Sequence, residues 1–128
     1  MQVSGRVLLI EDEANIAEAI RFILGRDGYE VVWSPDGEGL AGLIAAGRPD
    51  LVILDLMLPG RSGLDILADL KRDAATAAIP VLMLSAKGQG RDREAAVAAG
   101  AQVFMTKPFA NAEIRDQVRA LIAGGAVA

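Results

Sequence analysis

The sequence contains neither cysteine nor histidine. Without cysteine the chain can form no disulfide bond and no thiolate metal site. Without histidine it can neither use an imidazole as an acid or base nor act as a phosphohistidine donor. Any acid, base or metal chemistry of this chain must therefore come from carboxylates, hydroxyls and amines.

Aromatic residues are scarce at 4%, and long apolar runs are missing. No run approaches the roughly 20 residues of a membrane span, and the apolar run at residues 7–10 is too short for a signal peptide. We therefore expect a cytoplasmic protein that contacts no membrane. The net charge of −4, without a long basic segment, also argues against nucleic acid as a direct partner.

The length of 128 residues and the hydrophobic content of 52% fit a single domain, residues 1–128, with its core at about 5–123. Apolar runs predict strands, and apolar stripes with helical spacing predict helices between them. The expected strands are residues 6–10, 30–34, 51–55, 81–85 and 103–106. The expected helices are 14–26, around 40–44, from 63 to about 70, 91–99 and around 114–122, with a frayed tail at 124–128.

This alternation predicts an α/β protein of the (βα)₅ type. Helical crossovers between strands imply a parallel sheet with right-handed connections. Strand order 2-1-3-4-5 is one of two common doubly wound solutions, and it gives the three-layer sandwich called flavodoxin-like. Its switch point, where ligands bind in such folds, lies between the first and third strands.

Polar residues follow four of the five predicted strands. Glu11 and Asp12 follow the first strand and Asp55 ends the third. Ser85 ends the fourth strand and Lys107 follows the fifth, whereas the second strand ends without such a group. Because the carboxyl ends of parallel strands share one edge, we expect these five side chains to converge there.

Three carboxylates held together would repel one another. At about 4–5 Å and an effective dielectric near 20, each pair costs roughly 3–4 kcal/mol. A divalent cation would relieve this repulsion, and a ligand set of oxygens favours Mg²⁺, with Mn²⁺ as a substitute, over Zn²⁺. Asp55 could then act as a carboxylate nucleophile on a phosphoryl group, with Lys107 as a fixed positive charge and Ser85 as a hydrogen-bond donor.

Each of these residues also has a simpler interpretation. Asp12 could be a helix N-cap, Glu11 a solvated loop acid, and Lys107 a surface lysine. Ser85 alone is weak evidence, because serine is common at strand ends. Asp55 is hardest to dismiss, since an acid that follows four apolar strand residues is costly to bury unless it is paired.

With these residues in place, the chain resembles the receiver domain of two-component response regulators, a family with the chemotaxis-type fold that illustrates this strand order. The resemblance covers about residues 5–123. Its motifs are Ile-Glu-Asp-Glu at 10–13, Leu-Asp-Leu-Met-Leu-Pro-Gly at 54–60, Leu-Ser-Ala at 84–86 and Phe-Met-Thr-Lys-Pro-Phe at 104–109.

The resemblance implies a role for each site residue. Asp55 would be the phosphoacceptor and, with Asp12 and the backbone carbonyl of Met57, a ligand of Mg²⁺. Glu11 would lie in the outer shell of the metal. Ser85 would be the switch hydroxyl, Lys107 the catalytic lysine and Phe104 the switch aromatic. Pro108 would follow a cis peptide bond, and Met57 and Lys87 would tune the lifetime of the phosphoryl group.

The resemblance also implies partners. The phosphoryl donor would be a histidine kinase or a histidine phosphotransfer protein, and the fourth helix, fifth strand and fifth helix would form the surface read by a downstream protein effector. No turnover of an external substrate is expected, so the chain would not be an enzyme. We expect a monomer, with phosphorylation-linked dimerisation as the alternative. Residues 100–103 lack the paired acids typical of receivers that dimerise before binding DNA.

Three other functions remain open. A haloacid-dehalogenase-like phosphatase needs a second acid two residues after its nucleophile, and that position here is Met57. A flavodoxin-like cofactor site would need to hold a phosphate in the first loop, where Glu11, Asp12 and Glu13 would repel it. A pseudo-receiver that only docks a partner, without phosphorylation, would be expected to lack site residues.

Overall fold

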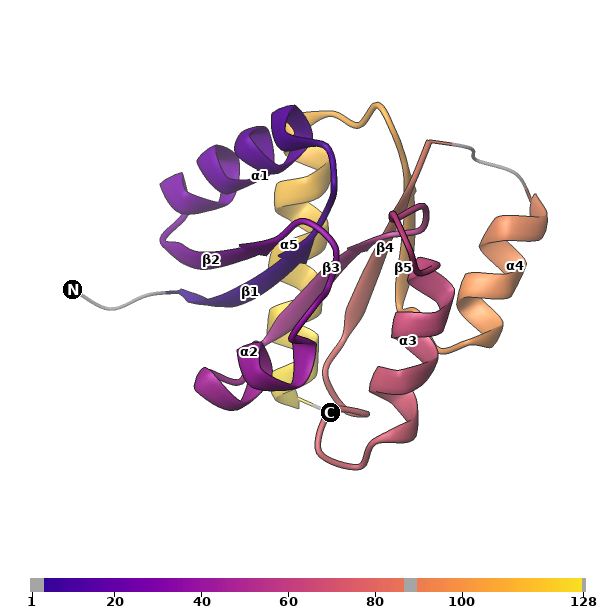
Figure 1. The fold of residues 1–128 in the computed structure, drawn as a ribbon. Coiled ribbons are helices and arrows are strands. Elements are labelled where there is room, and N and C mark those ends of the chain that lie inside the picture. The colour runs from indigo at the N-terminus through magenta and orange to yellow at the C-terminus, as the bar shows by residue number, and fades with distance from the viewer. Residues whose placement is uncertain (1–3, 87–89, 128) are drawn as a thin grey trace.

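The structure is a computed structural model that describes residues 4–86 and 90–127. Within these residues strands and helices alternate along the chain, as the sequence predicts (Figure 1). The strands are β1 (Gly5–Ile10), β2 (Tyr29–Ser34), β3 (Leu51–Asp55), β4 (Val81–Ser85) and β5 (Val103–Thr106). The helices are α1 (Ala14–Arg26), α2 (Leu40–Ala46), α3 (Gly63–Arg72), α4 (Gly90–Ala98) and α5 (Asn111–Val127). None of the described helices is long and apolar enough to cross a membrane.

The strands form one parallel sheet of five strands in the order β2-β1-β3-β4-β5. This confirms the predicted fold class and strand order. The register aligns the strand ends, with Ile10 opposite Leu54 and Ser85 opposite Thr106. The polar residues at or after these ends therefore lie along one edge of the sheet.

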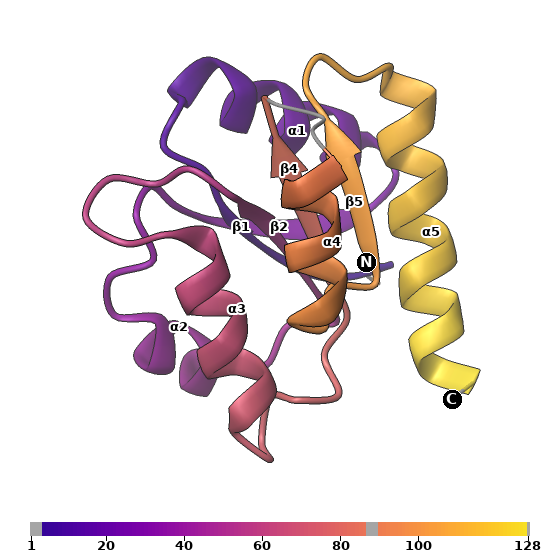
Figure 2. The same ribbon diagram turned by 90° about the vertical axis from the view of Figure 1, so that its right-hand side faces the viewer.

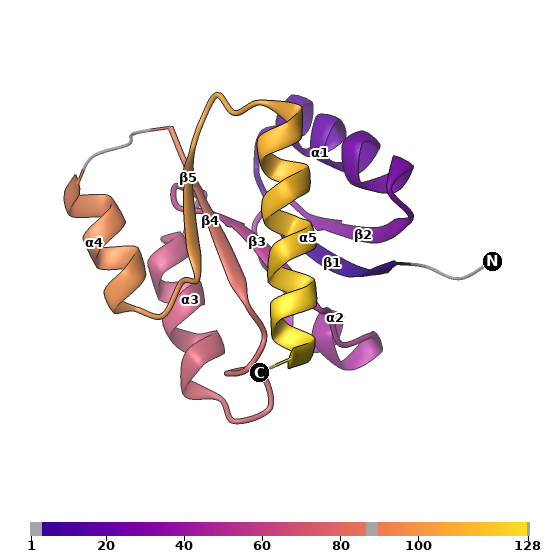
Figure 3. The same cartoon turned by 180° about the vertical axis from the view of Figure 1, so that it is seen from behind.

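Two helical layers cover the two faces of the sheet. Helices α1 and α5 lie on one face, and α2, α3 and α4 lie on the other (Figures 1 and 3). Strands β1, β3 and β4 are buried on both faces because they are apolar at nearly every position. Successive residues then alternate between the two cores: Val7 and Leu9 pack under α1 and α5, and Leu8 and Ile10 pack against α3.

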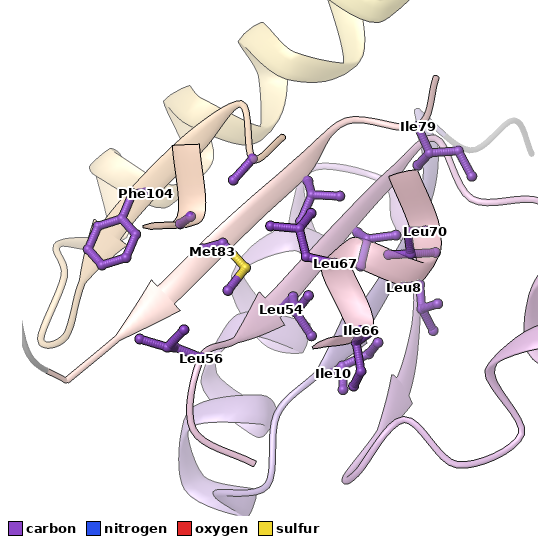
Figure 4. Packing of buried hydrophobic residues seen from close by; sticks show 14 residues of the cluster. Leu8, Ile10, Leu54, Leu56, Ile66, Leu67, Leu70, Ile79, Met83 and Phe104 are labelled. Atoms are coloured by element: carbon purple, nitrogen blue, oxygen red, sulfur yellow. The ribbon is translucent and has the colours of Figure 1, made fainter. Parts of the chain in front are cut away.

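The core under α3 and α4 extends to the fifth strand. Figure 4 shows Phe104 of β5 at one end of this cluster, with Leu54, Leu56 and Met83 among the side chains that line it. Phe104 is only 6% exposed. A change in its orientation would therefore change the packing beneath α4.

The end of the last helix differs from the prediction. We expected residues 124–128 to fray, but α5 continues to Val127. The reason is that glycine weakens a helix by only about 1 kcal/mol and keeps its N–H donor. Since no proline follows residue 108, nothing in the sequence forces the helix to end earlier.

Candidate functional site

The acidic residues that follow β1 and end β3 meet at the carboxyl edge of the sheet. One carboxylate oxygen from each of Glu11, Asp12 and Asp55 lies within 4.8 Å of the others. Glu11 and Asp55 are buried, whereas Asp12 is exposed. The cluster is therefore a half-enclosed acidic site that opens to solvent beside Asp12.

Lys107 brings a positive charge to the two buried acids. Its Nζ lies 2.8 Å from Glu11 Oε1 and 3.1 Å from Asp55 Oδ2, and its side chain is 10% exposed. The backbone N–H of Lys107 donates a hydrogen bond of 2.8 Å to Ser85 O. The peptide bond between Lys107 and Pro108 is cis, as the resemblance implied. The lysine is thus held in place by the neighbouring strand and is not a surface lysine.

The simpler interpretations of the two acids after β1 also fail. The N-cap position of α1 is occupied by Glu13, not by Asp12, and no side chain caps this helix. Glu11 is 0% exposed and is therefore not a solvated loop acid. The loop after β1 thus places Glu11 and Asp12 at the strand edge, where neither caps the helix and only Asp12 is exposed to solvent.

Burial and charge shift the pKa values of this cluster. Burial raises the pKa of Glu11 to about 7, and the neighbouring Asp55 adds to this, while Lys107 opposes it. Burial alone would lower the pKa of Lys107, but the neighbouring carboxylates of Glu11 and Asp55 outweigh that effect and raise it. Lys107 therefore stays charged. Among the acids whose pKa is shifted, Glu11 is the one whose ionised form is most disfavoured by its surroundings.

The surroundings of Glu11 hold its backbone firmly. Trp33 Nε1 donates a 2.8 Å hydrogen bond to Glu11 O, and Glu11 N donates to Ser34 O at 3.1 Å. The sequence analysis missed this role for the end of β2. The signal was a tryptophan near the end of a strand, because a partly buried indole N–H needs an acceptor.

One oxygen of Glu11 is poorly satisfied. Oε2 accepts a 3.1 Å hydrogen bond from Glu13 N. Oε1 is buried and receives no well-aligned hydrogen bond from the described part of the chain, although Lys107 Nζ is close to it. A buried carboxylate oxygen of this kind is costly to leave without a partner.

Asp55 is positioned by the loop that follows β3. Met57 N donates a 3.2 Å hydrogen bond to Asp55 Oδ1, and Leu56 N continues the sheet by donating to Leu84 O. Gly63 N closes the loop by donating to Leu56 O. Met57 is 68% exposed, and its backbone contacts Asp55, so this residue could affect the access of water.

Two of the three remaining predicted site residues lie in the described part of the chain. Ser85 is buried at the end of β4, next to β5. Phe104 is buried on the α4 side of the sheet, and the guanidinium carbon of Arg93 lies 5.0 Å from the centre of its ring. Lys87 lies outside the described residues.

The donor set fits a hard divalent cation. The three side chains that could bind the ion are carboxylates that come close enough to share it, and one of their oxygens, Glu11 Oε1, lacks a well-aligned hydrogen bond. Such oxygen sites suit Mg²⁺ or Mn²⁺, whereas Zn²⁺ prefers nitrogen and sulfur ligands. The acidic group of Glu11, Asp12 and Asp55 is therefore a candidate magnesium site.

Comparison with known proteins gives a consistent result. The family model of the response regulator receiver domain matches residues 7–119. The chain is 40% identical over 117 residues to the phosphate regulon transcriptional regulatory protein PhoB of Klebsiella pneumoniae, covering 91% of this chain and 51% of that protein. It is 41% identical over 117 residues to the DNA-binding dual master transcriptional regulator RpaA of Synechocystis, covering 91% of this chain and 48% of that protein. The chain thus spans about half the length of the curated relatives it matches.

One solved structure is similar to this chain in both fold and sequence. A putative response regulator from Chloroflexus aurantiacus superimposes with a TM-score of 0.88 at 31% identity, covering 93% of this chain and 98% of that one. Two of the relatives are named transcriptional regulators. With a match that spans nearly its whole length, the chain belongs to the response regulator receiver domain family, whose members act in two-component signalling.

Proposed function

We propose that this chain accepts a phosphoryl group on Asp55 from the phosphohistidine of a histidine kinase or a histidine phosphotransfer protein. One observation carries the proposal: buried Asp55 lies 3.1 Å from the Lys107 ammonium and shares its edge with two further carboxylates, Glu11 and Asp12. An acid placed in this way can serve as a nucleophile while the lysine offsets the charge of the incoming group.

The transfer would proceed in two steps. First, a carboxylate oxygen of Asp55 forms a bond to phosphorus while the phosphorus–nitrogen bond of the donor breaks, and the leaving imidazole keeps the electron pair and takes up a proton. Ser85 donates a hydrogen bond to one phosphoryl oxygen, and Lys107 balances the charge of another. Later a water molecule attacks phosphorus, inorganic phosphate leaves and the Asp55 carboxylate is restored. No external substrate is turned over, so we expect no ordinary enzyme activity.

The acidic residues would hold the metal that this transfer needs. Asp12, Asp55 and the carbonyl of Met57 would be the protein ligands, and Glu11 would act in the outer shell. When bound, Mg²⁺ supplies positive charge that offsets the phosphoryl oxygens, and Mn²⁺ could replace it. The ionised form of Glu11, disfavoured by burial, would be favoured beside a cation.

Phosphorylation would then change the output surface by a population shift. Ser85 and the loop after it would move towards the phosphoryl group, and Phe104 would rotate into the space that opens beneath α4. The surface formed by α4, β5 and α5 would thereby become competent to bind a downstream protein effector. We propose a monomer as the resting state.

Labelling with acetyl phosphate tests the proposal. We expect Mg²⁺-dependent formation of an acyl phosphate, detected by intact mass, that Asp55→Asn abolishes. Asp65→Asn, at an exposed acid of α3, is the matched control and should label normally. Continuous release of free phosphate from a phosphate ester would favour a phosphatase instead, and folded protein that takes up no label with Mg²⁺ would favour a docking module.

A further inference from the structure

A groove lies between α2 and α3, apart from the acidic site. Its volume is about 880 Å³, which is within the range of ligand-binding clefts. Its walls come from α2, from the loop at residues 59–61, and from the end of α3 with the residues that follow it. Glu11, Asp12, Asp55 and Lys107 do not line it. The groove is therefore separate from the acidic site. Helices α2, α3 and α4 lie on the same side of the sheet (Figure 2).

The groove exists because α2 is incompletely packed. No residue of this short helix is fully buried, and Leu40 and Ile44 only partly join the core. These two residues are one helical turn apart, so they lie on the same face, and both line the groove. Leu70 of α3 also lines the groove, but it is only 3% exposed, so Leu40 and Ile44 of α2 supply the accessible leucine and isoleucine surface. An amphipathic helix normally buries such a stripe, and here part of it remains accessible.

The charged residues around the groove are predominantly acidic. Asp36, Glu38 and Asp73 line it, and none of the three belongs to an ion pair within residues 4–86 and 90–127. Among the described residues that line the groove, the one cation is Arg61, and it already forms an ion pair, because its guanidinium lies 2.5 Å from Asp69 Oδ2. The apolar floor is thus surrounded by uncompensated negative charge.

We propose that this groove docks a basic amphipathic helix of a partner protein. The apolar residues of that helix would lie against Leu40 and Ile44, and its lysines or arginines would face Asp36 and Glu38. The wall formed by α2 is seven residues long, about 10 Å, which suits roughly two turns of a docked helix. The surface differs from the α4, β5 and α5 surface, so the inference does not depend on phosphorylation.

A synthetic peptide tests the inference with the unmodified protein. The probe is a fluorescent peptide of about 14 residues with leucine at helical spacing and lysine elsewhere. Two matched peptides carry glutamate or glutamine in place of lysine. We expect saturable binding of the lysine peptide that weakens with added salt, and binding at least about tenfold weaker for the other two.

Matched variants locate the site. Ala45→Trp fills the groove, and Ala46→Trp places the same side chain next to it on α2 but outside the lining. Glu38→Gln removes a groove charge, and Glu94→Gln removes an exposed charge of α4. We expect Ala45→Trp and Glu38→Gln to weaken binding by about tenfold and about threefold, and the two controls to change it less than about twofold. Circular dichroism of all four variants confirms that they are folded.

Three results would overturn the inference. Equal binding of the lysine and glutamine peptides would mean that the acidic residues of the groove do not favour a basic peptide. Unchanged binding in folded Ala45→Trp would mean that the peptide binds elsewhere. A dimer in sedimentation velocity that Ala45→Trp dissociates would identify a second copy of this chain as the occupant.

Discussion

The ammonium of Lys107 lies between two buried carboxylates, but it offsets only part of the charge at this edge. The third carboxylate, on exposed Asp12, comes within 4.8 Å of the other two. Two carboxylates at this distance repel each other only weakly when water fully screens them, and by about 3 kcal/mol at an effective dielectric of 20. Because Asp12 is exposed, we place its repulsion towards the low end of this range. The metal-free site should thus carry a stability cost that a cation removes.

Replacing Asp12 by asparagine should therefore stabilise the metal-free protein. We expect Asp12→Asn to raise the free energy of unfolding by about 1 kcal/mol in EDTA, because one of three mutually repelling charges is removed. The same variant should lose most of the increase in melting temperature that Mg²⁺ gives the native chain. Urea and thermal unfolding measure the two effects, with Asp65→Asn as the control. A less stable Asp12→Asn in EDTA would contradict the repulsion argument.

Met57 is the second residue at which the site makes a specific prediction. Its apolar side chain is exposed next to Asp55 and should impede the attack of water on an acyl phosphate. We expect Met57→Asn to lose the phosphoryl group several-fold faster, because an amide can hold the attacking water. The decay of acetyl-phosphate-labelled protein after removal of the donor gives the rate. An unchanged rate would remove Met57 from this role.

At the scale of elements, the connection between β3 and α3 depends on a close backbone contact. A Cβ at Gly63 would lie 2.2 Å from Asp55 O and 2.9 Å from Leu56 Cα. Glycine is therefore required where the first turn of α3 packs on the end of β3. This contact places the start of α3 against the end of β3, next to Asp55.

Gly63→Ala should consequently destabilise the protein by about 2 kcal/mol or more, because the new methyl group would overlap with backbone atoms that cannot move without disturbing β3. Gly42→Ala in α2 is a matched control, since nothing lies within 4 Å of its Cβ position. There alanine should stabilise the protein by about 0.5–1 kcal/mol through helix propensity. Urea denaturation of both variants checks the opposite signs, and equal effects would refute the packing argument.

Most element boundaries could be predicted because local signals and burial agree. The four apolar residues before Asp55 predicted β3 with the bounds that the structure has. The sequence signals for the end of α5 were weak, because Gly124 and Gly125 disfavour a helix but do not stop it. The role of Trp33 escaped prediction because its acceptor, Glu11 O, is 22 residues away in the sequence.

At the scale of the whole molecule, one ion pair joins the first helix to the last. Arg115 of α5 donates from Nε and Nη2 to the two carboxylate oxygens of Asp27, at 3.0 and 3.1 Å, where α1 ends. The hydrogen bonds from Arg115 hold the pKa of Asp27 below its usual value of 3.8. The pair thus tethers the two helices that cover the same face of the sheet (Figure 3).

This tether makes stability depend on pH in a defined direction. Since the pKa of Asp27 is lower in the folded protein, its contribution is present above the ordinary aspartate pKa and is lost as the pH falls through the folded value. We expect the native chain to be more stable than Asp27→Asn at neutral pH, and the difference to shrink below about pH 4. Urea unfolding of both proteins from pH 7 to pH 3 measures this, with Asp116→Asn as the control. A difference that grows as the pH falls would contradict the tether.

The sequence by itself determined the layered fold, the strand order and the residues at the strand ends. These follow from local apolar patterns and from the rule that parallel strands share one carboxyl edge. Only the tertiary structure decided that Glu11 is buried with a raised pKa, that Lys107 joins it to Asp55, and that α2 leaves a groove beside α3. Burial and charge pairing depend on which distant segments pack together, and a single pattern along the chain does not contain that information.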